Sequence, residues 1–192
     1  MVAIGDVAGA GLSATLAGVV AKSCLEVLVA GEGGLDDPER ILANLNAAAA
    51  TAERPILLSA FVAVLDPAAR VAKYASAGHL MPYLLRSGKP RLRVLKSRGA
   101  MLGDRETSSF KNESQELSPG DTLLFHTDGV VEAADRDGRV FGERRLQRAL
   151  LSSLDQKDSS PRDIVLRALD QFCGDAIADD DKALLVVRVL GA

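Results

Sequence analysis

The sequence lacks tryptophan, and aromatic residues make up only 4% of its 192 residues. A surface that stacks successive nucleotide bases needs aromatic side chains interleaved with lysine or arginine, so this class of single-strand binder is excluded. The chain also lacks an excess of positive charge, because 23 basic residues stand against 26 acidic ones and the net charge is −3. This balance argues against any nucleic-acid partner. The core must be built mainly from alanine, valine and leucine.

Long hydrophobic runs are also absent. The apolar stretch near the N-terminus, Ala14 to Ala21, ends at Lys22 and is far shorter than the ~20 residues of a membrane-spanning helix. The first residues carry no basic segment of the kind that begins a secretion signal. We therefore expect a cytoplasmic protein with no membrane contact.

Cysteine and histidine are scarce, with two residues of each. Cys24 and Cys173 have no metal-ligand spacing, and we expect free, buried thiols in a reducing compartment. His79 and His126 are too few for a histidine-based metal site. We expect His79 to be structural or hydrogen-bonding, and we assign His126 no catalytic role.

The hydrophobic pattern predicts one α+β domain over residues 1–192. Apolar positions at helical spacing indicate helices, and short apolar runs divided by turn residues indicate antiparallel strands joined by hairpins. Helices grouped at two places on the chain favour sheets covered by helix pairs. Helices are expected at Leu12–Ala30, from Asp36 to about Ala52, and near Glu143–Leu154 and Pro161–Phe172. Strands are expected at Val2–Ile4, Ile56–Leu65, Val71–Ser76, Tyr83–Arg86, Leu92–Leu95, Phe110–Leu117, Thr122–His126 and Leu184–Leu190.

Three aspartates stand at the ends of predicted strands. Asp6 follows the first strand, Asp128 follows Thr122–His126, and Asp180 precedes the last strand. The end of one antiparallel strand lies beside the start of its neighbour, so we expect all three carboxylates on one edge of the sheet. Each aspartate alone is typical of a turn or a helix cap, and only their combination indicates a functional site.

Such a cluster of carboxylates predicts a metal site. Carboxylates that gather without a counter-charge repel one another. Oxygen ligands with little histidine or cysteine nearby favour a hard cation, Mg²⁺ or Mn²⁺. Paired ions of this kind, ~3.5–4 Å apart, can activate water and stabilise phosphoryl oxygens. The chemistry indicated is therefore hydrolysis at phosphate.

A series of short motifs runs along nearly the whole chain. They are Gly5–Ala14, Phe61–Pro67, Tyr74–His79 with Pro82, Gly99–Gly103, Leu117–Asp121, Thr127–Ala133, Phe141–Gly142, and Asp179–Asp181 with Leu184–Leu185. Their identity and order resemble the SpoIIE-type branch of the PPM (type-2C) serine/threonine protein phosphatases. Each motif is weak alone, whereas the ordered series is specific.

The resemblance implies a four-layer αββα sandwich with the metal site between two sheets. In the family's pattern Asp6 would bridge two metal ions, and the backbone carbonyl of Val7 would bind the second. Asp128 and Asp180 would hold the first ion, with Asp181 beside it. A metal-activated water would attack phosphoserine or phosphothreonine directly.

The resemblance also implies partners. The substrate would be a phosphorylated bacterial regulatory protein of the anti-sigma-factor antagonist type. The two helices after the first motif would form a switch and a homodimer surface. Helix Leu12–Ala30 suits this role because it carries few charges.

Three departures from the family's pattern stand out. The family places an acidic metal ligand on one or two strands before Asp6, but this sequence begins five residues before Asp6. We therefore expect those strands and that ligand to be missing, with one metal ion in place of two and weakened activity. Ala10 stands where the family usually has histidine, and Lys182 and Ala183 replace an apolar residue and threonine.

Two alternatives stay open. The chain could be a degenerate phosphatase that binds a phosphoprotein or a second copy without turnover. It could also bind a dinucleotide, because Gly9–Ala14 matches a GxGxxA fingerprint between a strand and a helix, with Glu32 near the ribose-binding position. Asp6 argues against the dinucleotide alternative, because its negative charge would lie close to the phosphates.

Overall fold

The computed structural model describes residues 1–9, 11–31, 36–50, 57–88, 91–104, 109–156, 159–176 and 180–191. The chain divides into two compact units, which are described separately. Unit 1 comprises Met1–Met81 with Lys96–Leu117, and unit 2 comprises Pro82–Leu95 with Ser118–Ala192. Each unit holds a four-stranded sheet and helices. All strand pairs in the described residues are antiparallel, so the predicted α+β class is confirmed.

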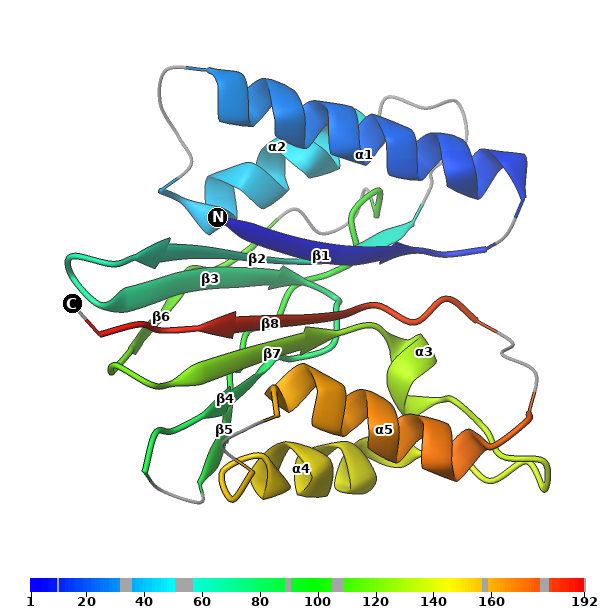
Figure 1. Ribbon diagram of the computed structural model, residues 1–192. Coiled ribbons are helices and arrows are strands. Elements are labelled where there is room, and N and C mark those ends of the chain that lie inside the picture. The colour runs from blue at the N-terminus through cyan, green and yellow to red at the C-terminus, as the bar shows by residue number, and fades with distance from the viewer. Residues whose placement is uncertain are drawn as a thin grey trace. The chain divides into compact units, whose positions relative to one another are not determined.

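Unit 1 is a sheet with two helices over one face (Figure 1). Its sheet has the order β1-β2-β3-β6, and α2 begins where predicted, with Pro38 in its first turn. Ile41, Leu42 and Leu45 of α2 pack with Val62 and Ala75 of the sheet in one apolar cluster. The elements are β1 Val2–Val7, α1 Leu12–Ala30, α2 Pro38–Ala50, β2 Leu58–Asp66, β3 Val71–Ala77 and β6 Glu113–Glu116. The predicted bounds of α1 are confirmed. The predicted end of α2 at about Ala52 and the predicted start of β2 at Ile56 lie outside the described residues.

Unit 2 is a second sheet with the order β5-β4-β7-β8, and helices α4 and α5 lie side by side along it (Figure 1). Leu146 and Leu150 of α4 and Val165 and Leu169 of α5 are buried. The elements are β4 Tyr83–Leu85, β5 Leu92–Val94, β7 Thr122–His126, α3 Asp128–Val131, α4 Gly142–Ser152, α5 Pro161–Cys173 and β8 Leu184–Arg188. The predicted bounds of β7 are confirmed, and α3 was not predicted.

One expectation about the three aspartates is wrong. Asp6 lies within β1, which pairs with β2 from Val2↔Ala63 to Val7↔Leu58. Asp128 follows β7 and Asp180 precedes β8, and these two strands belong to the other sheet. The three residues therefore do not share one sheet edge. The reason is that β1 continues past Ile4 and makes its pairing with the apolar strand β2, which no local pattern reveals.

The dinucleotide alternative is also wrong. A dinucleotide fold needs a parallel βαβ unit, whereas β1 pairs antiparallel with β2. Ala10 and Glu32, on which that alternative partly rested, lie outside the described residues. Among the described helices, none has both the length and the apolar character to cross a membrane. Both cysteines are free; Cys173 is buried and Cys24 is half-buried.

Candidate metal centre

The candidate centre in unit 2 forms where the pairing of β7 with β8 ends. His126 is opposite Leu184 in the last strand pair, and the next residues continue the connection. The amide of Thr127 donates to the carbonyl of Ala183 at 3.2 Å. The Thr127 hydroxyl donates to the carbonyl of Asp181 at 3.3 Å and accepts from the Ala183 amide at 3.0 Å. These bonds hold the start of α3 beside the segment that leads into β8.

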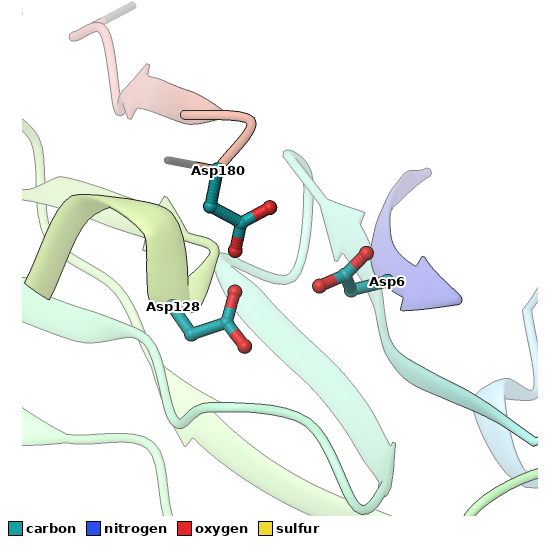
Figure 2. A group of neighbouring side chains, drawn as sticks. All are labelled: Asp6, Asp128 and Asp180. Carbon is teal, nitrogen blue, oxygen red and sulfur yellow. The ribbon is translucent and has the colours of Figure 1, made fainter. Parts of the chain in front are cut away.

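This connection brings Asp128 and Asp180 together. One carboxylate oxygen of each residue lies within 4.8 Å of the other, and the two side chains approach each other in Figure 2. In both residues Oδ1 accepts the backbone N–H of the following residue, Gly129 at 2.9 Å and Asp181 at 2.8 Å. Each carboxylate is thereby oriented locally and still offers a second oxygen to a ligand.

Within the described residues, no basic side chain balances the charge of this pair. Among the described residues, neither Asp128 nor Asp180 takes part in an ion pair. Two neighbouring carboxylates repel one another unless a cation or a proton intervenes. Oxygen donors alone, partly open to water, are the ligand set that Mg²⁺ or Mn²⁺ prefers. The residues present therefore fit a hard divalent ion.

Asp6 is placed by unit 1. It is half-buried on β1, directly opposite Ser59 on β2, and Figure 2 draws its side chain. The Oγ atom of Ser59 lies 2.8 Å from Nδ1 of His79, which is buried. The prediction that His79 has a hydrogen-bonding role is thus confirmed. The sequence did not reveal the contact between Ser59 and His79, because it joins β2 to the residues that follow β3.

The other predicted ligands are placed as follows. Val7 ends β1, and its side chain packs against the core of unit 1. Asp181 is exposed, and its carbonyl accepts the Thr127 hydroxyl. Ala183, at a position that departs from the family's pattern, bonds through its backbone alone. Asp179 lies outside the described residues. The ligand roles of Val7 and Asp181 stay predictions.

His126 is a core residue next to the candidate centre. It is 3% exposed, stacks on Tyr83 at 5.7 Å, and its Nδ1 lies 3.2 Å from the carbonyl oxygen of Thr127. Burial lowers the pKa of its imidazole despite the nearby carboxylates of Glu143 and Asp128. Tyr83 accepts a hydrogen bond from Gln147 at 3.1 Å. This packing connects β7 to α4 through Tyr83. That His126 has no catalytic role stays a prediction.

Solved structures define the class of this fold. The chain is similar to the SiaA-PP2C domain of Pseudomonas aeruginosa, with 23% identity, a TM-score of 0.81, and coverage of 97% of this chain and 74% of that one. It is also similar to RsbX, solved in complex with magnesium, with 18% identity, a TM-score of 0.67, and coverage of 96% and 78%. The fold is therefore that of the PP2C domains.

The sequence comparisons identify the family. The family described as Stage II sporulation protein E (SpoIIE) matches residues 1–190. The chain belongs to this family, and its class is that of the protein serine/threonine phosphatases. It is 28% identical over 190 residues to the phosphoserine phosphatase RsbU of Bacillus subtilis, which covers 97% of this chain. The chain spans 55% of RsbU and 20% of a second curated relative.

Proposed function

We propose that this chain hydrolyses phosphoserine or phosphothreonine on a phosphorylated regulatory protein of the anti-sigma-factor antagonist type. The observation that carries the proposal is the pair of adjacent carboxylates, Asp128 and Asp180, without a basic partner in the described residues. Membership of the SpoIIE family and the likeness to the phosphoserine phosphatase RsbU support the reaction. The likeness to RsbX, which was solved with magnesium, supports a divalent ion.

In this proposal the chain's own residues build the metal site. Asp128 and Asp180 bind Mg²⁺ or Mn²⁺, and the N–H groups of Gly129 and Asp181 orient them. Asp6 joins them, with the carbonyl of Val7 and the carboxylate of Asp181 as further ligands. A bound ion would supply positive charge for the phosphoryl oxygens and lower the pKa of a water molecule. Because Asp6 belongs to unit 1, residues 1–192 would act as one phosphatase domain.

Calorimetric titration with MnCl₂ and with MgCl₂ tests the metal site. We expect saturable binding to the wild type and a loss of at least about tenfold in affinity for Asp128→Asn, Asp180→Asn and Asp6→Asn, because each removes an anionic ligand. Asp170→Asn is the matched control, since Asp170 is exposed on α5. If metal affinity were unchanged in Asp6→Asn but reduced in the other two variants, Asp6 would not be a ligand of the bound ion. Unchanged binding in all three variants would reject the site.

Release of phosphate from a phosphoserine peptide, and then from a phosphorylated antagonist protein, tests the reaction. We expect turnover that needs Mn²⁺ or Mg²⁺ and falls by at least about 100-fold in Asp128→Asn, because the charge on the phosphoryl oxygens is then poorly stabilised. Turnover that survives this substitution would refute the mechanism. Binding of the phosphoprotein without any phosphate release would favour the degenerate alternative.

We further propose that two copies of the chain associate through α1. Its apolar side chains at Leu12, Leu16, Val19, Val20 and Val27 are at least half exposed, with spacings that place several of them along one side of the helix. An exposed apolar surface of this kind is typical of an interaction site. A second copy would cover it symmetrically.

Sedimentation analysis tests this association. We expect a dimer for the wild type and a monomer for Val20→Glu, because a charge would then be buried in the interface. Val140→Glu is the control, since Val140 is equally exposed but lies outside α1. A monomeric wild type would reject the dimer. If both variants were monomeric, the effect of Val20→Glu would not be specific to α1, and α1 would no longer be supported as the dimer interface.

A further inference from the structure

A groove runs between α4 and α5 on unit 2. Its volume is about 310 Å³, and its lining includes Phe141, Arg145, Arg148, Ala149, Ala168 and Phe172. Leu146, Leu150 and Leu169 of the same two helices are buried. Ala149 and Ala168 are the small residues that face the groove from the two helices, and their size leaves the space between the helices open. The volume corresponds to the lower end of the ~300–1,000 Å³ range of ligand pockets.

Aromatic side chains form part of the groove lining. The rings of Phe141 and Phe172 meet edge to face with centroids 5.6 Å apart. The guanidinium carbon of Arg145 lies 4.5 Å above the centre of the Phe172 ring. The same side chain donates to the carbonyls of Val140 and Phe141 at 3.1 and 2.9 Å through Nη1. These contacts orient the guanidinium, which has further N–H donors on its other nitrogens.

The rim of the groove is positively charged. Arg148 lies three residues beyond Arg145 on α4, so both side chains are on the same side of the helix. Arg148 is exposed and forms no ion pair with the described residues. Within that same part of the chain, no acidic side chain lines the groove. A chain with a net charge of −3 thus carries a local apolar hollow edged by two arginines.

We infer that this groove, defined by the six residues named above, is a docking site for an acidic peptide segment of another protein. The segment places one apolar side chain over Ala149 and Ala168 and its carboxylates against Arg145 and Arg148. Arginine binds carboxylates strongly through paired N–H donors, and a fixed guanidinium loses little freedom on binding. The inference uses only α4, α5 and Phe141, which directly precedes α4, so it is independent of the metal centre and of the proposed reaction.

A labelled, end-capped hexapeptide, Asp-Glu-Phe-Leu-Glu-Asp, tests the inference by fluorescence polarisation with the full chain. We expect saturable binding in the sub-millimolar range and a loss of about tenfold or more in Arg148→Glu, because a charge-assisted bond becomes a repulsion. Arg144→Glu is the matched control: Arg144 is exposed on the same helix, does not line the groove, and changes the net charge equally. Its affinity should stay within about twofold of the wild type.

A second variant and a second peptide test the apolar part of the groove. Ala168→Leu fills the hollow without changing charge, and we expect a similar loss of affinity. A hexaglutamate peptide, which lacks an apolar side chain, should bind about tenfold more weakly. The inference is overturned if the wild type shows no saturable binding at millimolar peptide, if Arg144→Glu and Arg148→Glu lose affinity equally, or if hexaglutamate binds as well as the apolar peptide.

Discussion

Gly129 in α3 lies so close to Asp181 that no side chain fits between them. A Cβ atom on Gly129 would overlap the carbonyl oxygen of Asp181 and lie 3.0 Å from its carbonyl carbon. The requirement for glycine here is one of space, since Gly129 does not have a positive φ. The start of α3, which carries Asp128, is therefore in close contact with the segment that carries Asp180 and Asp181.

Replacing Gly129 should therefore affect both stability and metal binding. We expect Gly129→Ala to lower the free energy of unfolding by about 1–3 kcal/mol, because the two backbones must separate, and to weaken Mn²⁺ binding. Gly18→Ala is the control: its Cβ would meet only Val7, at 4.0 Å, and it lies inside α1. That change should stabilise the chain by about 0.5–1 kcal/mol. Urea unfolding and calorimetry measure both effects, and normal metal binding by Gly129→Ala would contradict this account.

The hydrogen bond between Ser59 and His79 should contribute to the stability of unit 1. Ser59→Ala removes the 2.8 Å partner of Nδ1 on a buried imidazole, and we expect a cost of about 1–3 kcal/mol. Ser59→Thr keeps the hydroxyl, and threonine is favourable in a strand, so the loss of stability should be much smaller in this variant. Chemical unfolding of the two variants distinguishes them. Equal losses would show that packing, and not the hydrogen bond, makes Ser59 important.

Asp121 should be the residue that secures the turn before β7. Its carboxylate is buried, forms a 2.6 Å ion pair with Arg86, and accepts the amides of Ser87 and Ser118 at 2.9 and 2.8 Å. We expect Asp121→Ala to cost about 3 kcal/mol or more, since it leaves several polar groups without their acceptor. Asp137→Ala, which removes an exposed ion pair with Arg139, should cost at most about 1 kcal/mol. Thermal unfolding measures the loss of stability in the two variants. Similar losses would show that the buried Asp121 carboxylate contributes no more than an exposed ion pair.

Asp37 should make stability depend on pH in the acid range. The hydrogen bond from Asn112, at 2.6 Å, is the main reason that the pKa of Asp37 is lowered. A lowered folded-state pKa stabilises the fold above the unfolded pKa, about 3.9, and this contribution is lost as the pH falls through the folded pKa. Asn112→Ala should therefore destabilise more at pH 6 than at pH 3.

NMR titration checks the same relationship directly. The pKa of Asp37 should rise in Asn112→Ala, because this substitution removes the hydrogen bond that does most to lower it. A constant destabilisation across the pH range would mean that Asn112 acts only through its bond to the Glu39 amide, at 3.0 Å.

Local patterns predicted many elements because their signals are local. Helix α1 has the predicted bounds, since glycines flank a continuous helical sequence. Strand β7 follows a turn that ends at Asp121, and its five residues are all buried. Helix α5 begins after Ser160, whose hydroxyl accepts the Asp163 amide at 3.1 Å, with Pro161 in the first turn. Ordered motifs along the chain also predicted the family.

The chain's residue types by themselves determined its class, most of its elements and the three aspartates that indicate a metal. Only the tertiary structure decided that β1 pairs in a different sheet from β7 and β8, that α3 begins at Asp128, and that Asp37 meets Asn112. It also decided that Ala149 and Ala168 leave a groove between α4 and α5. The physical reason is one of range: turns, caps and periodicity act over a few residues, whereas strand partners and close approaches depend on side chains far apart in the sequence.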